Sequence, residues 1–362
     1  MTEKKFKAAL ISMQSKSSQM TIDAMRKYFL DVDDLNIKKI EISLEKEPKV
    51  LYEGKPFSKY DCILAKGSFR YADLLRSLTS ILSQDCFMPV KASAFSVGHD
   101  KLLTQLKLLR EGIPMPKTYI SATTAAAKNI VKQMSYPLVM KFPKGTHGKG
   151  VMFADSYEGA CSLLDALTAL HQAFIIQEYI ETGGIDYRAL VVGDKVVAAM
   201  KRKAVQGEKR ANLHAGGTGE FVSLDYATKK IAVKASKTMG IGICAVDLIQ
   251  SGQDSLVLEV NLSPGLQGIT KASGINVADH IAEYLFKETE KFREGKKEQT
   301  EEILAGLGIT SEEGLKDMIM LLQFRGKRIL LPEMITAVTK FNEEEEVLIN
   351  AEQNQLSIKK MK

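Results

Sequence analysis

The sequence is poor in the residues on which small cross-linked folds depend. It has 362 residues but no tryptophan, five histidines and only four cysteines. The cysteines fall at wide, unrelated spacings, Cys62, Cys86, Cys161 and Cys244, so neither a Cys-X-X-Cys nor a zinc pattern exists. We therefore exclude a small disulfide-stapled scaffold and expect a reducing, cytoplasmic compartment.

Long apolar runs are also missing. No stretch approaches the roughly 18 apolar residues that span a membrane, and the first residues carry no signal-like segment with a cleavage site. The 45% hydrophobic and 26% charged residues are typical of a globular protein of two or three domains without a membrane anchor. A net charge of +6 permits anionic ligands without singling out nucleic acid.

Strand-like and helix-like patterns alternate in the first 95 residues. We expect strands at residues 7–12, 37–42 and 62–65 and helices at 17–30 and 71–82. This alternation predicts an open α/β domain over residues 1–95.

A second, α+β domain is expected from residue 96 to 288. A helix at 101–111 ends at Gly112, because Pro114 and Pro116 prevent its continuation. We then expect strands at 137–142, 174–179, 187–192, 195–200, 241–250 and 255–262 and helices at 123–134, 157–169 and 228–239. The stretch 289–310 is rich in Lys, Glu and Arg, which indicates a solvated helix or linker, and it separates off a module at 311–362.

A glycine-rich loop follows one predicted strand, in the sequence Lys141-Phe-Pro-Lys-Gly-Thr-His-Gly-Lys-Gly150. Gly145, Gly148 and Gly150 would let backbone N–H groups approach phosphate oxygens, and the lysines would neutralise their charge. The spacing is not that of a Walker A loop. A mobile glycine-rich turn remains an alternative.

Single polar residues interrupt two strands that otherwise have core sequences. Glu259 and Asn261 share one face of the second strand, where Asp247 of its neighbour can meet them. Unpaired buried carboxylates are costly, and a divalent cation would relieve that cost; oxygen ligands suit Mg²⁺ or Mn²⁺. The alternative is a pair of carboxylates that face water or an arginine.

Cations recur after successive strands, at Arg188, at Lys201-Arg-Lys203 and at Arg210. If they converge on one cleft, they would stabilise a transferring phosphoryl group and a substrate carboxylate. Taken singly, a cation of this kind is more often a surface charge.

In this order, the motifs resemble those of the ATP-grasp carboxylate-amine ligases, and most closely the RimK-type α-L-glutamate ligases. The resemblance covers residues 5 to 285, weakly before residue 95. It is carried by Asp100-Lys101-Leu, by Leu190-Val-Val-Gly-Asp-Lys-Val-Val-Ala-Ala199, by Asn212-Leu-His214 with Gly216-Gly217, and by Glu259-Val-Asn-Leu-Ser-Pro-Gly-Leu-Gln-Gly-Ile269. Lys203 departs from the pattern, where arginine is usual, and the hinge loop at 181–184 is one residue short.

The resemblance implies an ATP-grasp fold, with the hinge between its two subdomains near residues 175–182, behind an N-terminal α/β domain. It implies phosphate contacts from Lys101, Lys141 and the loop glycines, an adenine pocket at Glu178 and Tyr179, and a nucleoside contact from Asp186. Arg188 and Arg202 would face the γ-phosphate and the acceptor, and Arg210, Ala211 and Asn212 would form a nucleotide and phosphate wall, Asn212 also belonging to the catalytic group. Asp247, Glu259 and Asn261 would ligate two Mg²⁺ or Mn²⁺ ions.

The implied activity is an ATP-dependent, ADP-forming ligation through an acylphosphate. It would add L-glutamate or another amino acid to the carboxylate of a protein C-terminus or a small molecule, and a homo-oligomer is expected.

The last 50 residues faintly resemble an AbrB-type swapped-hairpin module, a type that dimerises and often binds DNA. An ordinary small α+β cap that packs on the ligase or mediates self-association is the alternative. A different function for the whole chain would be a nucleotide-responsive DNA-binding regulator with a non-catalytic ATP-grasp fold.

Overall fold

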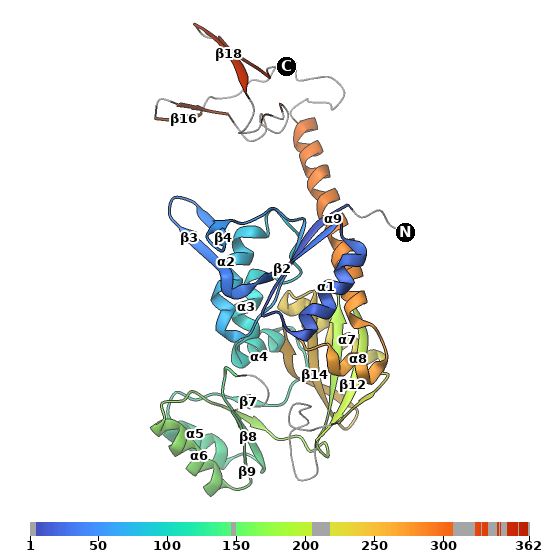
Figure 1. Ribbon diagram of the computed structural model, residues 1–362. Coiled ribbons are helices and arrows are strands. Elements are labelled where there is room, and N and C mark those ends of the chain that lie inside the picture. The colour runs from blue at the N-terminus through green and yellow to red at the C-terminus, as the bar shows by residue number, and fades with distance from the viewer. Residues whose placement is uncertain are drawn as a thin grey trace. The chain divides into compact units, whose positions relative to one another are not determined.

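The computed structural model describes residues 5–145, 150–204 and 218–306, together with 323–326, 328–331, 339, 341, 346–353 and 355–360. The chain divides into two compact units, Met1–Arg293 and Glu294–Lys362 (Figure 1). Among the described residues, no helix combines the length and apolar character that crossing a membrane would require.

The chain begins with a parallel three-stranded sheet in the order β2-β1-β6. Its strands are β1 (Lys7–Ser12), β2 (Asp31–Asn36) and β6 (Cys62–Ala65). The helix α1 (Lys16–Tyr28) begins where the Ser15 side chain accepts a hydrogen bond from the Ser18 N–H, and it buries Ile22 and Met25. The helices α2 (Ala72–Leu82) and α3 (Ala92–Gly98) follow. The predicted strands at 7–12 and 62–65 are therefore confirmed.

The strand predicted at 37–42 is wrong. The strand beside β1 is β2, whereas Ile37–Lys39 forms a 3-10 turn in which the Asn36 side chain accepts from the Lys38 N–H. The next strand, β3 (Ile40–Leu44), starts a separate antiparallel sheet with β4 (Pro48–Tyr52) and β5 (Lys55–Pro56). The β2 sequence buries only Val32 fully, so it lacks the apolar run that would have indicated a strand.

A small antiparallel sheet has the strand order β7-β10-β8-β9. Its strands are β7 (Thr118–Tyr119), β8 (Leu138–Lys141), β9 (Val151–Ala154) and β10 (Ile175–Glu178). The helices α5 (Thr124–Lys132) and α6 (Tyr157–Ala169) pack beside each other against it (Figure 1). Its core includes Val131, Met140, Leu164 and Ile176.

The larger antiparallel sheet has the order β13-β12-β11-β14-β15. Its strands are β11 (Ile185–Val192), β12 (Lys195–Lys203), β13 (Thr218–Phe221), β14 (Ile243–Ser251) and β15 (Asp254–Asn261). Alternate residues fill two cores, as strand periodicity requires. Val191 and Val246 pack in one core with α7 (Tyr226–Met239), whereas Leu190 and Ala245 pack in the other.

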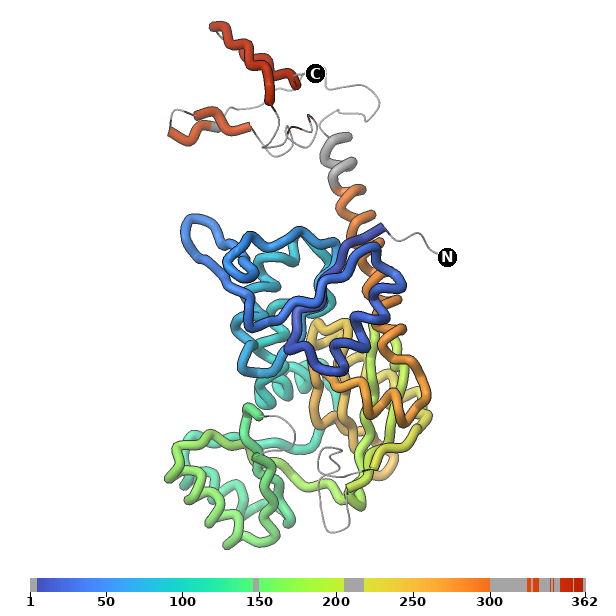
Figure 2. The backbone as a smooth tube through the Cα atoms, in the orientation of Figure 1, coloured from blue at the N-terminus to red at the C-terminus, as the bar shows by residue number. Residues whose placement is uncertain are grey.

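The helices α4 (Lys101–Arg110), α8 (Gln267–Ser273) and α9 (Val277–Gly306) complete the main unit, which holds α9 as far as Arg293. Segments far apart in the sequence lie side by side where α1 meets the start of α9 (Figure 2). The Phe29 and Phe286 rings meet edge to face at 5.5 Å, and Lys27 pairs with Asp279 at 2.8 Å. In the second unit, the described strands form two hairpins, β16 (Gln323–Arg325) with β17 (Arg328–Leu330) and β18 (Val347–Glu352) with β19 (Gln355–Lys360).

Candidate active site

The larger sheet brings its charged side chains together at one end of a single face. Arg188 of β11 lies opposite Asp247 of β14, and Asp247 lies opposite Glu259 of β15. Asp186 of β11 lies opposite Arg202 of β12. These positions continue the strand face of Leu190 and Ala245, so the charges start where the apolar core stops.

Two arginines and two aspartates alternate in a chain of ion pairs, in which Arg202 and Asp247 are buried and Arg188 and Asp186 are half-buried. Arg188 donates from Nε and Nη2 to the two carboxylate oxygens of Asp247, each at 2.7 Å. Arg202 holds Asp186 in the same way at 2.5 and 2.7 Å, and its Nη2 lies 3.2 Å from Asp247 Oδ2. Burial alone would raise the pKa of Asp247, but the two arginines outweigh it and hold the pKa at about 2.

Glu259 and Asn261 lie next to this chain, as the sequence predicts. Asn261 Nδ2 donates to Asp247 Oδ2 at 3.2 Å. The Glu259 carboxylate has no hydrogen-bond or ion-pair partner within the described ranges, and burial raises its pKa against the opposing effect of Lys101 and Lys141. The structure therefore confirms the predicted meeting of Asp247, Glu259 and Asn261.

The oxygen atoms of this group suit a hard divalent cation. No cluster of three or more His, Cys, Asp and Glu side chains fit for a metal occurs in the described part of the chain. An ion held by Asp247 and Glu259 would therefore need further oxygen ligands, and the Asn261 amide oxygen is a candidate. Glu259 accepts from no donor in the part of the chain that the structure describes, so its oxygens could serve this purpose. Asp247 already accepts from Arg188 and Asn261 and pairs with Arg202, so it offers only its remaining lone pairs. Metal binding by these three residues remains a prediction.

Two lysines approach from other elements. Lys101 is the first residue of α4, whose N-cap Asp100 accepts from the Leu102 and Leu103 N–H groups, and its Nζ donates to the Gly145 carbonyl at 3.1 Å. Lys141 ends β8, and its Nζ donates to Gln177 Oε1 at 2.5 Å. Burial lowers the pKa of Lys141 to about 8.

The predicted hinge at residues 175–182 begins with β10. Glu178 Oε1 accepts from the Lys117 N–H at 2.7 Å, and the Tyr179 ring meets Phe153 edge-on at 5.9 Å. Gly183 and Gly184, with φ of 62° and 70°, turn the chain into β11 of the larger sheet. A role in adenine binding for Glu178 and Tyr179 remains a prediction.

The glycine-rich loop is described at both ends. Gly150 has φ of 79°, and a Cβ atom there would lie 2.3 Å from the Phe142 ring, so only glycine fits. The predicted residues Gly148, Arg210, Ala211 and Asn212 lie outside the described residues.

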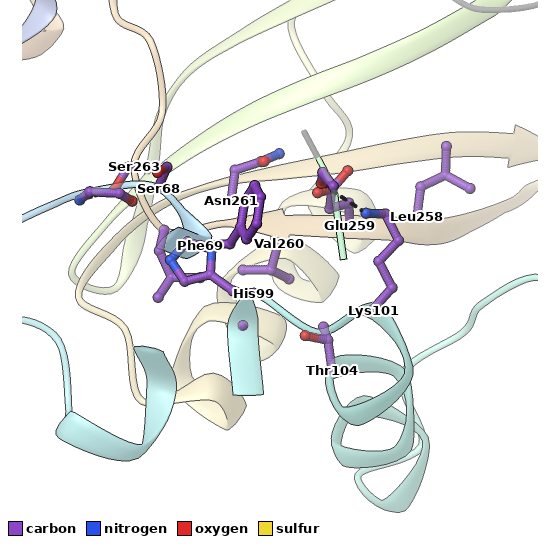
Figure 3. A pocket seen from close by; sticks show the side chains of 14 residues that line it. Ser68, Phe69, His99, Lys101, Thr104, Leu258, Glu259, Val260, Asn261 and Ser263 are labelled. Atoms are coloured by element: carbon purple, nitrogen blue, oxygen red, sulfur yellow. Dashed lines mark hydrogen bonds between the residues drawn. The ribbon is translucent and has the colours of Figure 1, made fainter. Parts of the chain in front are cut away.

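A cavity of about 200 Å³ adjoins Glu259, Asn261 and Lys101 (Figure 3). Its other walls are the loop 67–69 after β6, residues 98 and 99 at the end of α3, and the chain after β15. Ser263 Oγ accepts from the Gly67 N–H and donates to the Gly67 carbonyl, both at 3.0 Å. His99 Nε2 is buried without a partner within the described ranges, and burial lowers the pKa of His99.

The sequence had indicated neither His99 nor Ser263 as a site residue. Their only signal is adjacency, since His99 directly precedes Asp100-Lys101 and Ser263 follows Glu259-Val-Asn261 by one residue.

The sequence of this chain is similar to those of known proteins. Residues 98–285 match the family model described as "RimK-like ATP-grasp domain". A Legionella pneumophila protein named "Probable alpha-L-glutamate ligase" is 40% identical over 247 residues, which are 66% of this chain and 81% of the relative.

Solved structures match in fold. An ATP-grasp ligase, PsnB, complexed with a phosphomimetic variant of its minimal precursor, Mg and ADP, superposes with a TM-score of 0.63 at 14% identity, over 78% of this chain and 98% of PsnB. The D-alanine-D-alanine ligase of Coxiella burnetii gives 0.57 at 17% identity, over 84% of this chain and all of that one. The ATP-grasp fold predicted from the sequence is therefore confirmed. The chain belongs to the RimK-like ATP-grasp family and is an ATP-dependent ligase.

Proposed function

We propose that this ligase joins the amino group of L-glutamate, or of a similar amino acid, to the carboxylate of an acceptor through an acylphosphate intermediate. The observation that carries the proposal is the convergence of Arg188, Arg202, Asp247, Glu259 and Asn261 on one sheet face. The 40% identical relative named as a glutamate ligase supports the choice of amino acid.

ATP with Mg²⁺ would bind between the two sheets. Lys141 is a buried cation at the end of the small sheet, and Lys101 faces the same region from α4. These lysines would hold the phosphates, and Glu259 with Asn261 would supply oxygen ligands to two Mg²⁺ or Mn²⁺ ions, with Asp247 completing the set. The ions, when bound, neutralise charge on the phosphates.

The 200 Å³ cavity would hold the reacting carboxylate beside the γ-phosphate. It is bounded by Glu259 and Lys101 on one side and by the loop 67–69 on the other. Lys66 directly precedes this loop, and burial lowers its pKa to about 8. No carboxylate among the described residues is paired with Lys66, so a substrate carboxylate would be its counter-ion.

The reaction would run in two displacements. A carboxylate oxygen of the substrate attacks the γ-phosphorus, the bond to the β-phosphate oxygen breaks, and ADP leaves with that electron pair. The amine nitrogen then attacks the acyl carbon, phosphate leaves, and the amine proton passes to solvent. The protein would act by positioning and charge neutralisation, with Arg188 and Arg202 held in place by their aspartates, so no side chain serves as nucleophile.

The test is ADP release on incubation with ATP, Mg²⁺, L-glutamate and a panel of carboxylate acceptors. We expect release that depends on both amino acid and acceptor and that is lost in Glu259→Ala. Mass spectrometry of a lysate treated with enzyme, ATP and isotopically labelled glutamate would identify the product. A wild-type protein that binds ATP but releases no ADP with any acceptor would refute the proposal.

A further inference from the structure

A second hollow in the main unit has no residue in common with the cavity above. It is an open groove of about 1050 Å³ between α4, α7 and the turn that joins β11 to β12. Seven cations and two carboxylates line it, which gives the groove a net charge of +5 against +6 for the whole chain. Most of the excess positive charge of the protein is therefore gathered in one place.

The lysines of α7 dominate the groove. Lys230, Lys234 and Lys237 are exposed at positions i, i+4 and i+7, a spacing that places them on one side of the helix. Thr228, Ala232, Ala235, Ser236 and Met239 form the buried side of α7. The lysine stripe therefore takes no part in the core.

These cations have no acidic partner among the residues that the structure describes. In the described part of the chain, no ion pair joins any of the seven to a carboxylate, and Lys234 donates only to the carbonyl of Glu111. Lys230, Lys234 and Lys237 repel one another, because residues three or four apart on a helix lie about 5–6 Å apart at Cβ, within the Debye length of roughly 8 Å in physiological salt. A bound polyanion would relieve the repulsion.

We propose that this groove binds an acidic peptide segment, namely the glutamate-rich tail of a substrate or product. The inference rests on the proposed function, because each added glutamate replaces one carboxylate by two and so adds one negative charge to the acceptor. The groove is as large as the upper end of small-molecule pockets, roughly 1000 Å³, and it is open, which suits an extended chain.

The lining favours a peptide over a nucleic acid. Single-stranded nucleic acids are held by several aromatic side chains on which bases stack, and Tyr226 is the only aromatic residue among those that line the groove. Six of the seven cations are lysines, with Arg110 as the exception. Ammonium groups on flexible stems can follow carboxylates along a chain without fixed geometry.

The helix α4 connects the groove to the candidate active site. Lys101 at its first turn faces the site, whereas Lys107 and Arg110 line the groove. At about 1.5 Å per helical residue, Lys107 lies roughly 9 Å along the axis from Lys101. An extended peptide covers that distance in about three residues.

The experiment measures binding of fluorescein-labelled deca-L-glutamate to the full chain by fluorescence anisotropy, without nucleotide. The test variant is Lys230→Gln/Lys234→Gln/Lys237→Gln, and the matched control is Lys46→Gln/Lys49→Gln/Lys55→Gln, which removes three charges from exposed positions around the β3–β5 sheet. We expect binding that weakens with salt, about tenfold weaker binding in the test variant, and no change in the control.

Equal binding by the test variant and the wild type would overturn the proposal. So would an oligonucleotide of equal charge that displaces the peptide and binds more tightly, because the groove would then be a nucleic-acid site. Because peptide binding is measured without turnover, a failure of this proposal can be distinguished from a failure of ADP release. In the activity assay, the test variant should raise the KM of a long acidic acceptor several-fold and leave that of a single-carboxylate acceptor unchanged.

Discussion

Arg188 and Asp247 lie directly opposite each other on β11 and β14 and share two hydrogen bonds of 2.7 Å. The Asp247 side chain is 8% exposed and that of Arg188 is 20% exposed, so the pair is shielded from water. Arg202 also reaches Asp247, at 3.2 Å. The acidic residue expected to hold a metal is thus also the residue that fixes the two arginines expected to face the γ-phosphate.

Replacement of Arg188 by alanine should destabilise the protein. It leaves the buried Asp247 carboxylate with Arg202 as its remaining cation, and we expect the free energy of unfolding to fall by about 2 kcal/mol in urea denaturation. The double variant Arg188→Met/Asp247→Leu, in which neither charge remains, should recover stability to within about 1 kcal/mol of wild type.

Activity should behave differently from stability in this series. If Arg188 and Asp247 act on phosphate and metal as proposed, the stable double variant will still release no ADP. A double variant that regains both stability and turnover would show that the pair is only structural.

Glu259→Gln should stabilise the protein and at the same time abolish its activity. Because burial raises the pKa of Glu259, ionisation of this carboxyl costs more free energy in the folded protein than in the unfolded chain. The neutral, similarly shaped glutamine should raise the free energy of unfolding by about 1 kcal/mol and abolish Mg²⁺-dependent ADP release. Chemical denaturation and the ADP assay test the two parts, and a destabilised variant would show that the carboxylate has a partner that stabilises it.

Lys66 should make stability depend on pH in the alkaline range. Burial lowers its pKa from 10.5 to about 8 in the folded protein. Between these values the unfolded chain binds the proton and the folded chain does not, so stability rises with pH through this window. We expect Lys66→Met to stabilise the protein by about 1 to 2 kcal/mol below pH 8, and the gain to shrink to nothing above pH 10.5.

Urea denaturation of the wild type and Lys66→Met at pH 7, 9 and 10.5 measures this dependence. A stability difference that stays constant with pH would contradict a titrating Lys66. Lys66→Arg keeps its positive charge throughout this pH range. Its free energy of unfolding should therefore not rise between pH 8 and 10.5, and the cost of burying the charge should remain.

The sequence predicted those parts of the fold that local pattern determines. For strands with apolar runs, such as β1 and β6, the predicted first and last residues match those of the structure. The helix predicted at 157–169 likewise matches α6. The strand β2 was missed because its stability comes from pairing with β1, which leaves no periodic signal in Asp-Val-Asp-Asp-Leu-Asn. Tertiary pairing, not propensity, determines that strand.

The same distinction applies to the candidate site. Spacing alone put Glu259 and Asn261 on one face, because a strand has a fixed period of two. The ion pairs of Asp247 with Arg188 and Arg202 depend on the register of three strands, and the cavity depends on a contact between residues 67 and 263. No local pattern encodes such distant contacts. Arginine as an alternative partner for these carboxylates was nevertheless recognised from the sequence.

Ser263→Ala tests whether that distant contact shapes the cavity. The Ser263 hydroxyl holds the Gly67 N–H and carbonyl at 3.0 Å each, and so ties the loop 67–69 to the end of β15. Without the hydroxyl, both backbone groups lose their partner, which should lower the free energy of unfolding by about 1 to 2 kcal/mol. The KM of the acceptor should rise several-fold while ATP affinity stays unchanged, because the lysines that would hold the phosphates lie on α4 and β8. Ser263→Thr, which keeps a hydroxyl, should restore the free energy of unfolding and the KM of the acceptor. If ATP affinity fell together with acceptor binding in Ser263→Ala, the contact would instead belong to the nucleotide site.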